Sequence, residues 1–487
     1  MSNLLEIGKS GLFASKKSLE TTAHNLANTN TEGYSRQRAE MQNSRPLPKH
    51  GLILGTGVDV KQIKRIHDSN VEKGLNKALS KHHFFNERSS QLEKIEKAFN
   101  EIDVEGLHKV LGRFYNSFRQ LANKPENEAI RSIVRENARL VIKDFRALRQ
   151  QLDLAARSID NRIMNGINEI NEKIQLITEL NVKIRILEAG NDESGDLRDL
   201  RDRAARKLSE YFKINYYHDN KGAFIVSAEG VGTLVTGGIG QKLKTVHKSQ
   251  QESSNNMANS VEIYLENKPG YKITERFKDG NLSSLVNLRN KDIRNLQDNI
   301  DNTAYELIQT VNAVHRRGFV NRTIPIDDKK MPDLNDQKGP TFGVNFFKEP
   351  NRRYQAALDM DLSDAIKNDL SNMATALSPN KPGDNRVALA ISKLQHEKVM
   401  ENGTATIEEN FLKNIGHIGL KAQKANFDKE HSKGILNQLN SIRERVSGVS
   451  IDEEAANMIK FQNAYEASAK VMSTADAMFK AILSIAP

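Results

Sequence analysis

Residues 25–37 read NLANTNTEGYSRQ, and the helical pattern of the chain stops inside this stretch. Leu26 and Ala27 end an apolar run, and small or polar residues follow as far as Gly33. Asn side chains compete for backbone hydrogen bonds, and Gly favours the left-handed conformation that ends helices. The sequence therefore predicts a helix end and a turn outward. An extended polar chain should follow, which Pro46 and Pro48 keep out of a helix.

The residues before this stretch form a heptad pattern over about 3–28. Four leucines recur at every seventh position, and Gly8, Ser15 and Thr22 stand three positions after the first three of them. Such a seam, with large and small residues in alternation, requires a partner helix. The leucines are Leu5, Leu12, Leu19 and Leu26.

The last 40 residues repeat this arrangement. One edge of the predicted seam consists of Ile451, Met458, Tyr465, Met472 and Phe479, and the other of Phe461, Ser468, Ala475 and Ile482. Ser450 and Glu453 have the spacing of a capping box at the start of the helix. Both ends of the chain are thus predicted helices, which can pair with each other or with neighbouring subunits.

Between the ends, apolar residues at helical spacing predict long helices over 126–189, 285–314 and 406–446, the last opened by the capping-box pair Thr406 and Glu409. Residues 209–275 are rich in β-branched and aromatic residues between turns, and 320–358 hold four prolines. The expected fold is mainly α. Its parts are a terminal helical domain (1–50 plus 447–487), a helical bundle (51–208 plus 276–446) with an irregular loop at 320–358, and an inserted β-rich domain (209–275).

The composition narrows the function. The 487 residues include 28% charged and only 6% aromatic residues, and neither Cys nor Trp. Disulfides, zinc–thiolate sites and Cys nucleophiles are therefore excluded. The net charge is +10, but acidic residues are interspersed with the basic ones, which disfavours a nucleic-acid-binding stripe. No apolar stretch is long enough for a cleaved signal peptide or a membrane span.

Motifs for catalysis or cofactor binding are incomplete. Gly8-Lys9-Ser10 lacks the first glycine of a phosphate-binding loop, and the glycines of 229–240 do not follow the dinucleotide-binding spacing. His396-Glu397 begins like a zinc-protease motif, but Met400 stands where the second His is required. We therefore expect no catalytic residue, no cofactor and no metal ion.

NLANTNTEGYSRQ resembles the N-terminal signature of the bacterial flagellar axial proteins, the rod, hook and hook-associated proteins. Its ending, YSRQ, is similar to the hook-associated protein 1 family in particular. Residues 55–68 (GTGVDVKQIKRIHD) and 446–479 are similar to two further blocks of that family, and 196–214 and 383–395 match more weakly. The family usually has Pro where Glu32 stands.

This resemblance implies a structural subunit, not an enzyme, that forms a ring between the flagellar hook and filament. Implied partners are other copies of the chain, the hook protein, a second junction protein (hook-associated protein 3), the flagellar export apparatus and a chaperone that binds the C-terminal region. Nucleic acid and membrane insertion are not expected. The implied location is extracellular, after export without a cleaved signal, with terminal helices that stay disordered until they assemble.

The resemblance also implies which residues pack subunits together. They are the heptad leucines, the turn residues Asn28, Asn30, Gly33, Tyr34, Ser35, Arg36 and Gln37, and, in the last helix, Ile451, Met458, Phe461, Tyr465, Met472, Ala475, Phe479 and Ile482. Alternatives are another axial protein (a hook or distal rod subunit), an enzyme carried on an axial scaffold, and a cytoplasmic coiled coil that binds nucleic acid.

Overall fold

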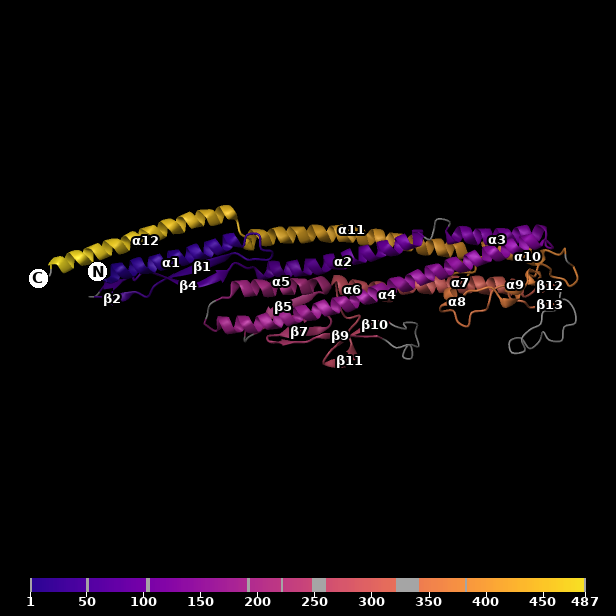
Figure 1. Ribbon diagram of the computed structural model, residues 1–487, viewed down its shortest axis with the longest axis horizontal. Coiled ribbons are helices and arrows are strands. Elements are labelled where there is room, and N and C mark those ends of the chain that lie inside the picture. The colour runs from indigo at the N-terminus through magenta and orange to yellow at the C-terminus, as the bar shows by residue number, and fades with distance from the viewer. Residues whose placement is uncertain are drawn as a thin grey trace.

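The computed structural model describes residues 2–49, 52–101, 106–190, 193–219, 222–247, 260–320, 341–381 and 383–485. The molecule is a long array of helices, and both ends of the chain lie at the same end of it (Figure 1). Most of the chain is helical, with a few small sheets, so the prediction of a mainly α fold is confirmed.

The first and last helices, α1 (Ser2–Ala27) and α12 (Ile451–Ile485), form an antiparallel pair. Asn25 at the end of α1 contacts Glu454 at the start of α12, and Gly8 lies against Met472. Each terminal helix thus has a partner within the chain. The expected disorder of these helices before assembly stays a prediction.

The polar chain after α1 does not turn outward as expected but forms a strand that returns along α1. This strand, β1 (Gln37–Asn43), pairs antiparallel with β4 (Val58–Arg65), and the hairpin β2 (Leu47–Lys49) and β3 (Leu52–Leu54) lies between them. The amide of Val58 donates a hydrogen bond to Ser10 Oγ at 3.2 Å. Both strands thus contact α1 and cover one side of the terminal pair.

The middle of the molecule is a bundle of long helices, and the three predicted long helices lie within it. The capping box of Thr406 and Glu409 is present at the start of α11. The run predicted at 285–314 is divided by a wider, π-helical turn, η4. The bundle elements are α2 (Ser69–Glu101), α3 (Leu107–Asn123), α4 (Glu128–Leu187), α5 (Gly195–Tyr211), α6 (Gly280–Asn287), η4 (Leu288–Ile293), α7 (Arg294–His315) and α11 (Ile407–Ser447).

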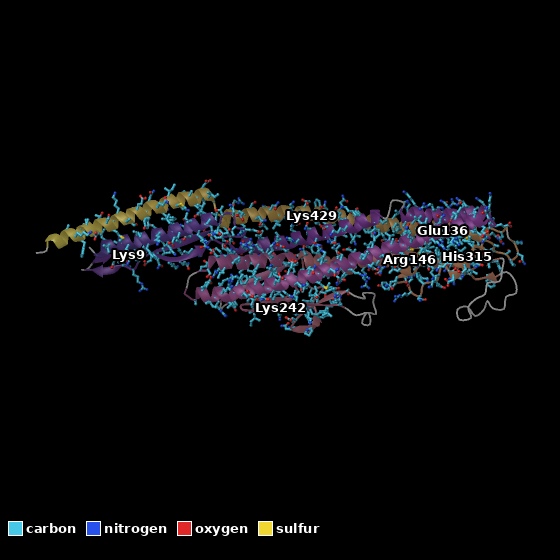
Figure 2. The ribbon with its side chains drawn as sticks, viewed as in Figure 1. Lys9, Glu136, Arg146, Lys242, His315 and Lys429 are labelled. Atoms are coloured by element: carbon cyan, nitrogen blue, oxygen red, sulfur yellow. The ribbon has the colours of Figure 1, made fainter. Side chains whose placement is uncertain are left out.

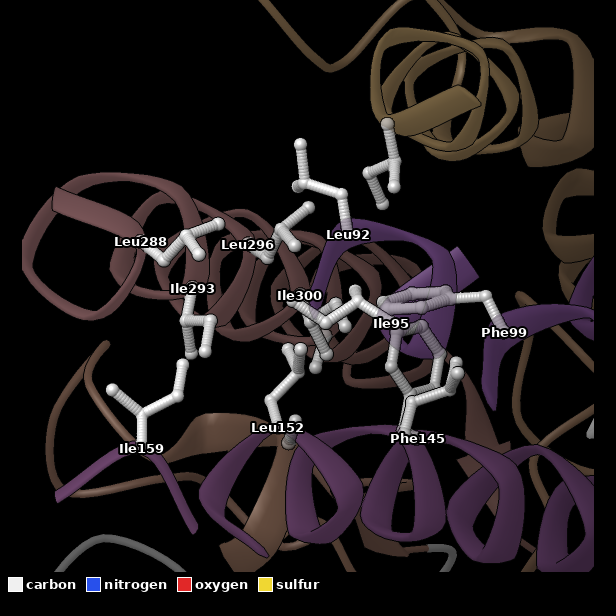
Figure 3. Close-up of a cluster of buried hydrophobic side chains, with 14 of the residues drawn as sticks. Leu92, Ile95, Phe99, Phe145, Leu152, Ile159, Leu288, Ile293, Leu296 and Ile300 are labelled. Atoms are coloured by element: carbon white, nitrogen blue, oxygen red, sulfur yellow. The ribbon is translucent and has the colours of Figure 1, made fainter. Parts of the chain in front are cut away.

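The hydrophobic core extends along the bundle, and one part of it lies between α2, α4 and α7. Figure 3 shows Ile95 of α2, Leu152 of α4 and Ile300 of α7 in one cluster of buried side chains. Buried residues recur three or four positions apart on each helix, so each helix buries one apolar face. Examples are Leu92 and Ile95, Leu148 and Leu152, and Leu296 and Ile300. The bundle is held together chiefly by this burial.

The β-rich region forms two small sheets beside α4. Asn171 of α4 exchanges two hydrogen bonds of 2.8 Å with the backbone of Leu243, and the buried Val226 and Ile263 belong to the bundle core. A separate domain at 209–275 therefore stays a prediction. The strands are β5 (Ile214–His218), β6 (Phe224–Ala228), β7 (Gly232–Thr236) and β8 (Ile239–Gly240) in one sheet, and β9 (Leu243–His247), β10 (Val261–Leu265) and β11 (Lys268–Lys272) in the other.

Short elements close the end of the bundle that lies far from the chain termini. Figure 2 labels His315 there and Lys9 near the termini. Of the predicted irregular loop at 320–358, residues 321–340 lie outside the described ranges. The short elements at this end are β12 (Phe319–Val320), β13 (Thr341–Phe342), α8 (Ala356–Asp359), α9 (Asp364–Asn368), η5 (Leu370–Asn372), α10 (Arg386–Lys393) and η6 (Leu394–His396). One further short element, η2 (Glu188–Gly190), follows the C-terminal end of α4.

Candidate functional site

The predicted signature lies where the terminal helix pair meets the bundle, a region that we call the joint. The joint comprises the end of α1, the turn 28–36, the end of α11 and the starts of α12 and α5. Asn28 closes α1, because its side chain donates to the carbonyl of His24 at 3.0 Å. Gly33 then takes a φ of +78°, which non-glycine residues rarely adopt. The chain can therefore reverse direction within a few residues.

Asn25 lies at the centre of the joint, and its buried side-chain amide forms hydrogen bonds with three other residues. Its Oδ1 accepts hydrogen bonds from Tyr34 Oη (2.8 Å) and from the Gln37 amide (2.9 Å). Its Nδ2 donates to the Gln37 carbonyl (2.9 Å) and to Glu454 Oε2 (3.1 Å). One side chain thus connects α1, β1 and α12, and every donor and acceptor of the amide is used.

Tyr34 is held in its protonated form. Burial raises the pKa of Tyr34, and the carboxylates of Asp196, Asp199 and Glu454 raise it further. The neutral phenol donates to Asn25 and contacts His24 Nδ1 at 3.0 Å. Its hydroxyl therefore acts as a fixed donor in the joint, with no chemistry of its own.

Arg36 connects the joint to α12. Its guanidinium lies 2.7 Å from Glu453 Oε2 and 2.7 Å from the buried Glu454 Oε1, and its backbone amide donates to the Ser447 carbonyl at the end of α11. A single residue thereby fixes the angle between α11 and α12. Hydrogen bonds to ionised groups contribute more than neutral ones, especially out of water.

A buried ion pair connects the joint to α5. The Ser35 amide donates to Asp199 Oδ2 at 2.8 Å, and Arg65 NH1 lies 2.7 Å from both Asp199 and Asp202. Burial disfavours the charge of Arg65, but Asp202 and Asp199 raise the pKa of this side chain, which stays ionised. Removing one member of a buried pair costs about 3–5 kcal/mol, so this contact holds β4 firmly on the bundle.

A second buried ion pair closes the joint from the side of α11. Arg443 Nε donates to Glu72 Oε1 of α2 at 2.9 Å, and its NH2 donates to the Tyr34 carbonyl at 3.2 Å. Gln37 reaches the start of α5, where its Nε2 donates to Asp196 at 2.7 Å. The signature residues Tyr34, Ser35, Arg36 and Gln37 therefore all serve one network, whereas Asn30 is exposed at its edge.

In α12, the predicted seam is the face that turns toward α1. Ala475 is buried, and five further seam residues are half-buried: Met458, Phe461, Tyr465, Ser468 and Met472. Ile451 and Phe479 are exposed, and the side chain of Ile482 lies outside the described part of the chain. The spacing is that of a coiled-coil face. These contacts are within one chain, so packing between subunits stays a prediction.

In α1, the small residues of the heptad are more deeply buried than the leucines, and Gly8 and Gly11 lie against α12. Gly8, Ser15 and Thr22 are buried, Leu12 and Leu19 are half-buried, and Leu5 and Leu26 are exposed. A Cβ at Gly8 would lie 2.8 Å from Met472 Cγ, and one at Gly11 would lie 2.8 Å from Ser468 Oγ. Only small residues permit so close an approach of the two helices. The large side chains remain available for contacts outside the chain.

Sequence reasoning missed the residues that complete the joint. Asn25, Arg65, Asp199, Arg443 and Glu454 were not singled out, although all are buried. One signal was present for Asn25, a polar residue three positions after the inward-facing Thr22. The others are charged residues in stretches rich in charge, Arg65 in a strand and the rest in helices, and their partners are remote in sequence.

The contacts of the joint position helices. Within the described ranges, no three His, Asp or Glu side chains lie close enough together to hold a metal ion. The helices of that same part of the chain are all too short or too polar to cross a bilayer.

Family models match three parts of the chain. A model described as the flagellar hook-associated protein FlgK helical domain matches residues 92–325. A flagella basal body rod protein model matches 5–34, and a model of the C-terminal part of the flagellar basal body rod FlgEFG proteins matches 444–485. The last two matches cover most of α1 and all of α12.

Relatives match over the whole length. Flagellar hook-associated protein 1 of Bacillus subtilis is 26% identical over 99% of this chain and 97% of its own, and that of Escherichia coli is 22% identical over the full length of both. The solved structure of the flagellar hook junction protein FlgK from Burkholderia pseudomallei has a TM-score of 0.63 at 15% identity, covering 77% of this chain and all of that one. The chain is therefore similar to flagellar hook-associated protein 1 over its whole length, and almost half of it matches the helical domain of that family.

Proposed function

We propose that the protein is a structural subunit of the bacterial flagellum that forms the junction ring between hook and filament and allows the filament to assemble. The observation that carries this proposal is the antiparallel pair of α1 and α12, which lies at one end of a long bundle and leaves large apolar side chains exposed. The similarity of the chain to flagellar hook-associated protein 1 supports it.

The outer surface of the terminal pair favours association with other subunits. Phe13 is 65% exposed, Ile459 60% and Phe479 53%. Burying one such side chain contributes about 1.5–3 kcal/mol, so a few of them together supply a substantial association energy. Exposed apolar residues that gather on one pair of helices are typical of an interaction site.

The joint gives such a subunit a fixed shape. The buried pair of Arg65 with Asp199 and the hydrogen bond from Arg443 to the Tyr34 carbonyl connect the terminal part of the molecule to the bundle. A ring between two different tubes requires subunits that keep one angle between these two parts under load. The network at the joint therefore supports a mechanical role.

We also propose specific binding partners for the protein. They are further copies of the chain in the ring, the hook protein on one side, the second junction protein (hook-associated protein 3) on the other, and the export apparatus with a chaperone at the C-terminal region. The protein would reach the outside of the cell without a cleaved signal. We propose no enzymatic activity. The alternative among the flagellar axial proteins is a hook or distal rod subunit.

A clean deletion in the source bacterium tests the proposal. Normal hooks without filaments, with filament protein in the medium, are expected because the filament has no base on which to assemble. Complementation with the wild-type gene should restore filaments.

Absent hooks in the deletion strain would favour the rod or hook alternative. Intact filaments would overturn the proposal and reopen the enzyme and nucleic-acid interpretations.

A further inference from the structure

A polar pocket of about 240 Å³ lies at the joint, between the turn after α1 and the last part of α11. Its walls include Asn30 and Gly33 from the turn, Arg206 from α5, and Asn440 and Arg443 from α11. The side chains that form the ion pairs and hydrogen bonds of the joint leave this space open. We call it the arginine pocket.

Two arginines at this place each have a guanidinium nitrogen without a hydrogen-bond partner. Arg206 lines the pocket, and Arg203 lies beside Gly33 of its wall. Arg203 and Arg206 lie one turn apart on α5, and the Nε atom of each is buried without a hydrogen-bond partner among the described residues. Arg206 Nε lies 3.6 Å from Glu72 Oε2, too far for a hydrogen bond, whereas Glu72 is bonded to Arg443 at 2.9 Å. Arg203 forms no ion pair with any residue that the structure describes.

Gly33 brings the turn directly against both groups. A Cβ at this position would lie 3.2 Å from Arg206 NH2 and 3.4 Å from Arg203 Nε. With glycine here, no side chain separates the backbone of the turn from the two guanidinium groups. The signature glycine therefore also shapes the wall of the pocket.

Glu32 and Glu444 line the pocket, and Glu72 lies beside Arg206. Glu72 and Glu444 both bond to Arg443, so they do not neutralise Arg203. Glu32 stands exposed on the turn and forms no ion pair within the described ranges. Guanidinium groups present several N–H donors in a fixed plane, which matches the geometry of a carboxylate or phosphate.

We propose that the arginine pocket binds an oxyanion, which Arg206 and Arg203 hold by charge-assisted hydrogen bonds. Two sources share this chemistry: a carboxylate side chain of a neighbouring copy, and a free inorganic anion. The first source rests on the proposed ring, and the second does not.

Inorganic phosphate is the probe for the pocket itself. Binding to the purified full chain is measured by calorimetry at constant ionic strength, with chloride as the balancing anion. Wild type should bind phosphate saturably, and Arg206→Gln should weaken binding at least tenfold. Arg203→Gln should weaken it in the same direction. Glu32→Gln should tighten binding, because it removes a nearby negative charge.

The matched control is Arg185→Gln. Arg185 is exposed near the end of α4 and forms no ion pair or hydrogen bond with the described residues, so its loss should leave phosphate binding unchanged. Circular dichroism checks that each variant keeps its helix content. The proposal is overturned if neither wild type nor Glu32→Gln binds phosphate saturably, or if Arg206→Gln binds as wild type does.

Filament formation in strains that carry the variants distinguishes the two sources of the oxyanion. If a neighbouring carboxylate occupies the pocket, Arg206→Gln should reduce filament formation while Arg185→Gln does not. Suppose that Arg206→Gln abolishes phosphate binding but the strain still forms normal filaments. The carboxylate of a neighbouring copy is then not the ligand, and the pocket binds a free anion. Failure of the ring proposal would appear separately, in the deletion strain, without any effect on phosphate binding.

Discussion

Asn25 and Glu454 stand 429 positions apart in the chain, and Asn25 Nδ2 donates a 3.1 Å hydrogen bond to Glu454 Oε2. Through this contact the last turn of the first helix meets the first turn of the last helix. Both side chains are buried, so the bond is protected from water.

Replacing Asn25 with Ala should destabilise the terminal part of the molecule by about 2–3 kcal/mol, because Tyr34, Gln37 and Glu454 would each lose a buried partner. Hydrogen exchange of the β1 amides should accelerate while the core of α4 stays protected. The control is Asn165→Ala, at an exposed position of α4. Equal exchange rates at β1 in Asn25→Ala and wild type would show that Asn25 does not hold the joint.

Replacing Gly33 with Val should impair ring assembly and leave export intact. The φ of +78° costs a β-branched residue about 1–2 kcal/mol, and the new side chain would press on Arg206. Gly33→Asn should be milder, since Asn tolerates this conformation better. Filament counts and secreted protein, measured on the same cultures, separate assembly from export. Normal filaments in Gly33→Val would contradict the role given to the turn.

Replacing Gly8 with Leu should separate α1 from α12. Even the Cβ would lie 2.8 Å from Met472 Cγ and 3.3 Å from its backbone nitrogen, and inserting a large side chain into a close contact costs about 1–3 kcal/mol. Gly416→Leu is the matched control, because this helical glycine of α11 has open space around it. Faster hydrogen exchange along α12 is expected in the first variant only. Protection of α12 as in wild type would mean that the two helices do not depend on this close approach.

Acid should weaken the far end of the bundle through His315. Its Nδ1 donates to the Val344 carbonyl at 2.7 Å, and its Nε2 accepts from the Ala374 amide at 2.9 Å, so the buried ring is neutral. Burial lowers the pKa of His315 from 6.5 to about 4. The unfolded chain therefore takes up a proton between these values that the folded chain does not, and stability is lost as the pH falls through this window.

At about 1.36 kcal/mol per pH unit, His315 should remove about 3 kcal/mol from the free energy of unfolding between pH 6.5 and pH 4. Chemical denaturation at a series of pH values measures this slope. His315→Gln supplies a donor and an acceptor without titrating, so it should flatten the slope, whereas the exposed His431→Gln should not. An unchanged slope in His315→Gln would assign the acid sensitivity to other groups.

The sequence by itself determined the long helices and the pattern of the last seam. In α4, α11 and α12, residues three or four positions apart share one face, and the capping box of Thr406 and Glu409 acts within one turn. These signals are local, so the elements follow from short stretches. The same holds for the stop after Ala27, where Asn28 and Gly33 end the helix through their own backbone and side-chain preferences.

Only the tertiary structure decided which face of α1 is buried and how the joint is built. The heptad contains both leucines and small residues, and the close approach of α12 selects the small ones. The pairing of β1 with β4 and the partners of Asn25, Arg65 and Arg443 join segments that are distant in the chain. The sequence around a polar residue does not indicate which distant residue will be its hydrogen-bond partner. Such contacts form because burial leaves each charge and amide with one geometry in which its hydrogen bonds are satisfied.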